Sequence, residues 1–326
     1  MDNLLEIRNL SISIGDKATG FEVVSDVSIS VPKGKIIGLV GESGCGKTIT
    51  ALSVMKLLPD PPARITGGEI IFKDKNILEM SQGELRNLRG NEISMIFQEP
   101  VSSLNPVYTV GEQIGETIRT HSEITKKDER EKVIELLKLV GIPEPERRYS
   151  NYPHELSGGM CQRVMIAIAL CCSPDLLIAD EPTTALDVTV EAGIIDLIDK
   201  LRIDLGMSVV LITHDLGIIS EIADEIYVMY AGRIVEKAQN ELLFKSPKHP
   251  YTLGLLNSIP DLDGAIQKNL KMIKGNIPSP QNYPQGCRFN DRCDIVIDKC
   301  RHSVPLLEKV ENNHQSACFR SDEVSI

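Results

Sequence analysis

The chain has 326 residues, of which 25% are charged and 42% are apolar, and its formal net charge is −11. This composition predicts a globular protein of about two domains and excludes a largely disordered chain. The acidic balance argues against nucleic acid as a partner, because a non-specific nucleic-acid surface needs a basic stripe.

The first residues show no basic stretch followed by an apolar core, so a secretory signal is not expected. The longest apolar run, 164–172, has nine residues, whereas a membrane-spanning helix needs about 20. Any membrane association must therefore come through a partner, and without an export signal we expect the chain in the reducing cytosol. In that reducing compartment its eight cysteines are poor candidates for disulfides.

Short β-branched runs alternate with longer helical patterns, which predicts an α/β fold with a largely parallel sheet. The predicted strands cover 35–40, 70–73, 92–98, 176–179, 208–213 and 225–228. Helices are predicted over 48–58 and over most of 110–170, where 132–140 has a clear amphipathic period. A turn at 231–233 predicts a hairpin into 234–236.

Eight consecutive residues after the first of these strands fit the nucleotide-loop pattern G-x-x-x-x-G-K-[ST]. They are Gly41, Glu42, Ser43, Gly44, Cys45, Gly46, Lys47 and Thr48. Gly44 and Gly46 let backbone amides point toward phosphates, and the N-terminus of the following helix adds positive potential. We expect Lys47 to lie between the β- and γ-phosphates of ATP and Thr48 to place its hydroxyl on Mg²⁺. The flanking strand and helix disfavour a plain glycine-rich surface turn.

The predicted strand 176–179 ends in two acidic residues, Asp180 and Glu181. Asp180 is placed to hold Mg²⁺, and Glu181 is placed to polarise the attacking water. Alone, this pattern would equally fit a strand that runs into a solvated turn. Together with the glycine-rich loop it favours the catalytic acid of an ATPase.

Two further polar residues end predicted strands. His214 follows 208–213 and is interpreted as a contact to the γ-phosphate, although a lone histidine there is more often a packed or edge residue. Gln98 ends the strand 92–98, from which its amide could reach the metal or the attacking water. By itself Gln98 would carry no interpretation.

A second candidate phosphate contact lies at Ser157, Gly158 and Gly159, directly before the helical run 160–170. This helix start has no bulky side chains over its amides, and such ends bind anions. The alternative is an ordinary helix capped by a serine.

The set and order of these motifs resemble the ATP-binding cassette (ABC) ATPases over residues 3–240. The shared elements are the phosphate loop, the glutamine loop at Gln98, the signature at 156–160, the acidic pair 180–181, Ala185-Leu186-Asp187 as the D-loop and His214 as the switch. The resemblance implies a P-loop NTPase core with an antiparallel β-subdomain and a helical subdomain. It also implies a head-to-tail dimer, in which Ser157 and Gly159 of one chain contact the γ-phosphate held by the other. Asp187 would communicate across that interface.

Additional motifs are similar to those of the ATPase subunits of oligopeptide, dipeptide and nickel importers, and they extend the resemblance to nearly the whole chain. They are Gln98-Glu99-Pro100 with Ser103-Leu104-Asn105-Pro106, Pro247-Lys248-His249-Pro250-Tyr251-Thr252, and the run from Pro278-Ser279-Pro280 through Gly286-Cys287-Arg288-Phe289 to Arg292-Cys293. The implied partners are a second cassette, identical or related, two transmembrane permease subunits and, indirectly, an extracytoplasmic solute-binding protein.

Most members of the ABC family stack adenine on an aromatic residue just after the first strand, where this chain has Ile14. Phe21 is the nearest aromatic residue and is one candidate for the base contact. The alternative is that Phe21 packs on the sheet and that apolar residues such as Ile14 and Val24 hold adenine.

Prolines and cysteines accumulate from about residue 246, so a smaller unit should begin between 240 and 275. We expect an ATPase core over 1–97 and 171–240, a helical signature subdomain over 98–170, and a C-terminal unit over 241–326.

The C-terminal unit contains four cysteines, Cys287, Cys293, Cys300 and Cys318. Their gaps fit neither a short zinc knuckle nor the common ferredoxin runs, so zinc, an iron–sulfur cluster and unligated thiols all stay open from spacing alone. The importer resemblance implies a [4Fe–4S] cluster, with zinc as the alternative, in a structural role.

The other cysteines have different predicted roles. Cys161, Cys171 and Cys172 fall in an apolar helical run and are expected to pack. Cys45, inside the phosphate loop, is expected to be reactive when nucleotide is absent.

The resulting hypothesis is an ATPase subunit that powers import of short peptides, with Lys47, Gln98, Glu181 and His214 as its catalytic residues. An importer of nickel or another small solute is the alternative within transport. A soluble ABC protein of translation or DNA repair is disfavoured, because the chain has one cassette and no room for a long coiled coil. A nucleotide-regulated scaffold would lack the catalytic acid that Glu181 supplies.

Overall fold

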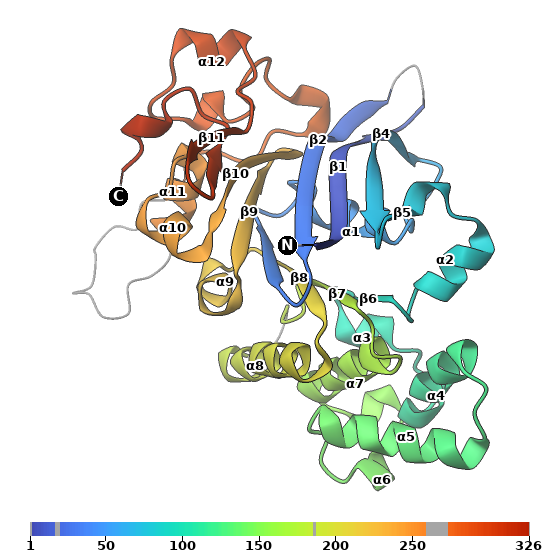
Figure 1. Ribbon diagram of the computed structural model, residues 1–326. Coiled ribbons are helices and arrows are strands. Elements are labelled where there is room, and N and C mark those ends of the chain that lie inside the picture. Colours follow the sequence, from blue (N-terminus) through green and yellow to red (C-terminus); the bar gives the residue numbers. More distant parts are fainter. Residues whose placement is uncertain (1, 17–19, 185–186, 259–272, 326) are drawn as a thin grey trace. The chain divides into compact units, whose positions relative to one another are not determined.

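The computed structural model describes residues 2–16, 20–184, 187–258 and 273–325. These residues form two compact units (Figure 1). Unit 1 comprises the described parts of 1–32, 36–78 and 211–326, and unit 2 comprises 33–35 and the described parts of 79–210. The three-part division expected from the sequence stays a prediction.

Unit 1 contains an antiparallel sheet with the strand order β2-β1-β4-β5. Its strands are β1 Asn3–Ile14, β2 Phe21–Pro32, β4 Ala63–Phe72 and β5 Lys75–Asn76. Buried positions alternate with more exposed ones along much of β2, as expected where one face of a sheet meets the core. This sheet is the antiparallel β-subdomain that the resemblance implies.

A second run of strands in unit 1 has the order β11-β12-β10-β9-β3. Its bounds are β3 Ile36–Val40, β9 Glu225–Tyr230, β10 Arg233–Gln239, β11 Glu308–Glu311 and β12 His314–Ser316. β3 and β9 are parallel, and the other neighbours are antiparallel. All five residues of β3 are buried, as a near-continuous apolar run predicts for a central parallel strand. The hairpin predicted at 231–233 is confirmed as the turn between β9 and β10.

The helices of unit 1 are short. They are α1 Lys47–Val54, α9 Leu216–Ile222, α10 Asn240–Lys245, α11 Pro250–Leu256 and α12 Asp298–His302. α1 was expected over 48–58 but ends four residues earlier, because Lys56 adopts a left-handed φ of 50° and the amide of Leu57 turns back to Leu52.

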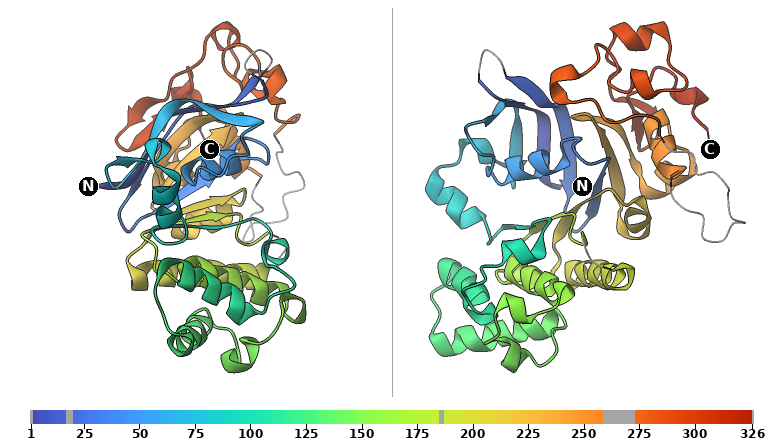
Figure 2. Two further views of the ribbon diagram at one scale, coloured as in Figure 1. Left: turned by 90° about the vertical axis from the view of Figure 1, so that its right-hand side faces the viewer. Right: turned by 180° about the vertical axis from the view of Figure 1, so that it is seen from behind.

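Unit 2 holds the parallel pair β6 Ile93–Ile96 and β7 Leu176–Asp180, with β8 Ser208–Thr213 as the next strand beside β7. The boundary between the units falls inside β8. The helices are α2 Gln82–Leu88, α3 Pro100–Ser103, α4 Val110–His121, α5 Lys126–Leu139, α6 Pro145–Arg148, α7 Gly158–Leu170 and α8 Val188–Leu205. α7 packs against α3, α4 and α5, and Figure 2 shows this green cluster from two further sides.

The helical cluster confirms the prediction of a mostly helical stretch over 110–170. The amphipathic period at 132–140 belongs to α5, whose Val133, Leu136 and Leu137 are buried. Thr109 caps α4 and its side chain accepts a hydrogen bond from the amide of Glu112, which fixes where that helix begins. Among the described residues, no helix is both long enough and apolar enough to cross a bilayer.

Candidate functional site

The glycine-rich loop connects β3 to α1 within unit 1. Gly46 is the N-cap of α1, has a left-handed φ of 112° and offers no side chain to cap the helix. A Cβ atom added at Gly46 would lie 2.9 Å from Cε of Met229, so glycine is required both for the turn and for the close approach. Ser43, Gly44 and Thr48 are exposed. The helix therefore begins with backbone amides that no side chain covers, which is the arrangement that binds anions.

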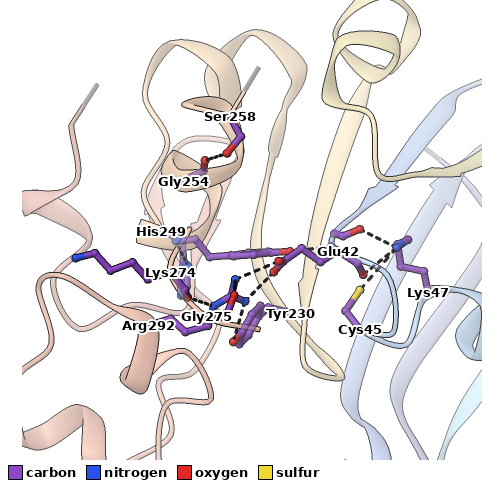
Figure 3. Close-up of polar contacts among 12 residues, drawn as sticks. Glu42, Cys45, Lys47, Tyr230, His249, Gly254, Ser258, Lys274, Gly275 and Arg292 are labelled. Atoms are coloured by element: carbon purple, nitrogen blue, oxygen red, sulfur yellow. Dashed lines mark hydrogen bonds and ion pairs between the residues drawn. The ribbon is translucent and has the colours of Figure 1, made fainter. Parts of the chain in front are cut away.

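Lys47 is buried within this loop. Its ammonium donates hydrogen bonds to the carbonyl oxygens of Gly41 at 2.7 Å and Glu42 at 3.1 Å (Figure 3). Its third contact is the sulfur of Cys45 at 4.0 Å, a long and weak interaction. The loop thus folds around its own lysine, and the cation is fixed at the centre of the turn.

Cys45 differs from what the sequence predicted. Its side chain is fully buried, and burial raises the pKa of its thiol although the charge of Lys47 acts in the opposite direction. Both properties oppose formation of the reactive thiolate. The expectation of a reactive thiol at Cys45 is therefore wrong, because the loop turns this side chain into the protein.

His214 and the candidate adenine residues also lie in unit 1. His214 is exposed and directly follows β8, and Asp215 caps α9 by accepting hydrogen bonds from the next amides. Ile14 and Phe21 are paired across the ends of β1 and β2, and both are half-buried. Val24 is fully buried. Which of these contacts adenine stays a prediction.

Unit 2 brings two of the predicted catalytic residues together. Gln98 lies just beyond β6 and Glu181 just beyond β7, which are adjacent parallel strands. The Gln98 amide donates a hydrogen bond to the Glu181 carboxylate at 2.8 Å, and the Thr184 hydroxyl donates to the same oxygen at 3.1 Å. Asp180 is buried as the last residue of β7. The two polar strand ends therefore meet at one edge, a contact that the sequence analysis did not predict.

The signature residues form the start of α7. Ser157 is its N-cap and accepts a hydrogen bond from the amide of Met160 at 3.4 Å. A Cβ atom at Gly159 would lie 2.9 Å from Val190 on α8, so this turn approaches the neighbouring helix closely. Asp187 caps α8 by accepting a hydrogen bond from Val190 at 3.0 Å. The other two D-loop residues, Ala185 and Leu186, lie outside the described residues.

The four C-terminal cysteines line one small cavity in unit 1, together with Phe289 and Phe319. Burial raises the pKa of Cys287 to about 12, with a further contribution from the neighbouring thiols. Burial likewise raises the pKa of Cys318 to about 11. Among the described residues, no three His, Cys, Asp or Glu side chains are arranged to hold a single metal ion.

The remaining cysteines fit their predicted packing role. Cys161 and Cys171 are buried, and Cys172 is half-buried with its sulfur 3.8 Å from that of Cys171. Two residues that contact the phosphate loop were not predicted as site residues, Tyr251 on α11 and Arg292 beside Cys293. Both occur in motifs that the sequence highlighted, but nothing in those motifs indicates a contact with residue 42.

Comparison with known proteins supports the same interpretation. The family model described as ABC transporter matches residues 24–184, and the one described as the C-terminal region of oligopeptide/dipeptide transporters matches residues 235–300. The chain is 48% identical to the oligopeptide transport ATP-binding protein AppD of Bacillus subtilis over 99% of its own length and 98% of that protein. It is 47% identical to the dipeptide transport ATP-binding protein DppD of Haemophilus influenzae, covering 94% and 92% of the two chains.

Solved structures show the same fold. One is a dimeric ATP-binding cassette in a post-hydrolysis state with ADP and phosphate, with a TM-score of 0.65 and 25% identity over 72% of this chain and 98% of that chain. Another is the cassette cbiO1 of Clostridium perfringens, part of an ABC transporter complex, with a TM-score of 0.64 and 26% identity over 75% and 91% of the two chains.

Proposed function

This chain belongs to the ABC transporter ATPase family, and from that premise we propose that it hydrolyses ATP to drive import of short peptides through a membrane complex. The observation that carries the proposal is the hydrogen bond between Gln98 and Glu181 at the ends of adjacent strands. A buried carboxylate held by an amide donor and a hydroxyl donor is a fixed acceptor, which is what orienting an attacking water requires.

We assign the phosphates of ATP to the loop 41–48, on the backbone amides and on Lys47. Lys47 is held at the centre of the loop by two carbonyl oxygens, so its charge is already in place before phosphate arrives. His214, exposed beyond β8, is assigned to the γ-phosphate. Catalysis then consists of positioning and charge stabilisation, as expected for phosphoryl transfer.

Mg²⁺ is assigned to Thr48, Gln98 and Asp180. The donor set fits a hard cation, because it offers a hydroxyl, an amide oxygen and a carboxylate at chain positions where loops leave strands or helices begin. When bound, the ion would neutralise charge on the phosphates. Glu181 is not assigned to the metal. We assign it as the group that accepts the proton of the attacking water.

Dimerisation is part of the proposed mechanism. The exposed residues Ser157 and Gly158 at the start of α7, with Gly159, would contact the γ-phosphate on a second cassette, and Asp187 would lie at the interface. That cassette is either a second copy or a related chain. The complex further includes two transmembrane permease subunits, which hold this chain at the cytoplasmic face of the membrane, and, on the other side, a solute-binding protein.

Peptide import is proposed over nickel import for two reasons. Residues 235–300 match the family model for the C-terminal region of oligopeptide/dipeptide transporters, and the relatives AppD and DppD are named as oligopeptide and dipeptide transport proteins. Proteoliposomes that contain the complete transporter separate the two. Mg-ATP should drive uptake of a labelled dipeptide, whereas uptake of Ni²⁺ without peptide uptake would favour the alternative.

A [4Fe–4S] cluster is proposed at Cys287, Cys293, Cys300 and Cys318. The four thiols share one cavity but do not converge on a single ion position. Each cysteine of such a cluster binds a different iron, so its ligands surround a volume rather than a point, whereas zinc needs four ligands at one centre. The support for the cluster is the importer resemblance together with the cavity that the four cysteines share, and zinc stays the alternative. Its role would be to hold a small proline-rich unit that has little apolar core of its own.

The proposed catalysis is tested with Glu181→Gln. We expect ATP binding within about twofold of wild type, hydrolysis lowered by about 100-fold or more, and closed dimers in the presence of Mg-ATP. Glu135→Gln, an exposed change on α5, is the matched control and should leave all three unchanged. Wild-type turnover in Glu181→Gln would overturn the assignment.

A further inference from the structure

An arginine of the C-terminal segment, by which we mean the described residues after 240, contacts the phosphate loop 41–48. The Arg292 guanidinium meets the Glu42 carboxylate through two parallel contacts, of 2.8 Å to one oxygen and 3.1 Å to the other (Figure 3). A bidentate pair of this kind fixes both the distance and the plane of the carboxylate. Glu42 is the second residue of the loop, so its position is set by a residue far along the chain.

Arg292 is itself immobilised. The remaining guanidinium N–H groups donate to the carbonyl oxygens of Lys274 at 2.8 Å and Gly275 at 3.2 Å and to the Tyr230 hydroxyl at 3.4 Å. Its side chain is 6% exposed, and its guanidinium lies over the rings of Tyr230 and Phe289. The arginine is a charged anchor whose five N–H groups are all used.

A second contact holds the backbone of the same loop residue. The amide of Glu42 donates a hydrogen bond to the Tyr251 hydroxyl at 2.8 Å, and Tyr251 is fully buried on α11. The carbonyl of Glu42 accepts from Lys47. Side chain, amide and carbonyl of this one residue are therefore all occupied.

Arg292 adjoins the cavity that the four cysteines line. Arg292 directly precedes Cys293, and Phe289, whose ring centroid lies 5.9 Å from Cζ of Arg292, lines that cavity. The rings of Tyr230, Tyr251 and Phe289 form one cluster with centroid separations of 4.6 to 5.6 Å. Packed aromatic side chains of this kind transmit displacement instead of absorbing it.

We propose that Arg292 and Tyr251 are positioning residues that hold the phosphate loop in its binding conformation and make ATP affinity depend on the C-terminal segment. The inference rests on the proposed binding of ATP phosphates to residues 41–48. Two effects contribute. Fixing Glu42 removes the ordering cost that the loop would otherwise bear on binding, and pairing its carboxylate screens a negative charge beside the phosphates.

The test is a double-mutant cycle on the full-length chain, with Arg292→Gln, Glu42→Gln and the combined variant, read out as the Kd of a fluorescent ATP analogue. Arg292→Gln should weaken binding by about tenfold, or about 1.4 kcal/mol. In the Glu42→Gln background the same change should weaken it by less than about twofold, because the pair is already broken. Arg292→Lys, which keeps the charge but not the bidentate geometry, should fall between.

Lys309→Gln is the matched control. Lys309 is exposed on β11, so this change removes one positive charge from the same part of the chain without contact with the loop or the cysteine cavity. It should leave the Kd unchanged. Tyr251→Phe removes one hydroxyl from a buried site and should weaken binding by about threefold, which provides a second route if Arg292→Gln folds poorly.

The outcomes separate this inference from the assignment of the loop. Loss of binding in Lys47→Ala tests whether the loop holds the phosphates. If Lys47→Ala loses binding while Arg292→Gln and Tyr251→Phe both bind like wild type, the positioning role is overturned and the ATP site stands. Equal effects of Arg292→Gln with and without Glu42 would also overturn it, because the arginine would then act through something other than the pair.

Discussion

A buried carboxylate, Glu236, joins the C-terminal segment to the sheet of unit 1, and its replacement by glutamine should destabilise the protein strongly. Glu236 lies on β10 and is fully buried. It accepts hydrogen bonds from the amides of Lys248 at 2.5 Å and His249 at 3.1 Å. Nε2 of His314, on β12, lies 2.7 Å from the same carboxylate. Three partners thus converge on two oxygens.

The magnitude follows from this geometry. A glutamine has nearly the same shape, so no cavity forms, but only one of its two terminal atoms can accept. The other is an NH₂ group that must face a backbone N–H or the histidine. At least one hydrogen bond to a charged group is lost, and a buried donor is left unsatisfied, for a total of about 3 kcal/mol.

Urea unfolding followed by circular dichroism measures the effect. Glu241→Gln is the control, because Glu241 is 85% exposed and its ion pair with Lys245 should contribute no more than about 0.5 kcal/mol. A loss below about 1 kcal/mol for Glu236→Gln would show that the three contacts do not hold the carboxylate as a charged acceptor, and the reasoning would fail.

Two further predictions concern the loop and the cysteines. Gly46→Ala should weaken ATP binding by about tenfold, measured with a fluorescent nucleotide, because the new Cβ meets Met229 and φ is 112°. Gly206→Ala also replaces a glycine of positive φ, 68°, but its new Cβ would have no atom within 4 Å, so this control should bind normally. Equal loss in both variants would contradict the prediction. Anaerobically purified protein should contain about four irons and four sulfides per chain and absorb at about 400 nm, and Cys300→Ser should lose them while Cys172→Ser does not; zinc alone would contradict the cluster.

The sequence correctly predicted the features that a run of neighbouring residues is enough to identify. The loop 41–48 and the acidic end of β7 each combine a local pattern with a flanking element, so both could be located from the order of residues alone. The meeting of Gln98 with Glu181 was also within reach, because parallel strand ends gather at one edge of a sheet.

The parts that were missed depend on where a side chain points or on distant segments. Cys45 lies inside a correctly identified loop, but the pattern does not say which side chains turn inward. Arg292 and Glu42 are 250 residues apart, and a single sequence has no periodicity that pairs them. The early end of α1 depends on one left-handed residue, Lys56, which is not a glycine and so gives no local signal.

The short hairpin near the C-terminus also decides which backbone groups this protein exposes. β12 pairs with β10 at Glu236, Lys237 and Ala238, so this stretch of the β10 edge is paired instead of being available to another chain. The outermost strand of this run is then β11, where Glu308, Lys309 and Glu311 are charged. Charged side chains on a short outer strand discourage intermolecular pairing. A chain cut before residue 308 would leave this stretch of β10 as an unpaired edge, and we expect that chain to self-associate.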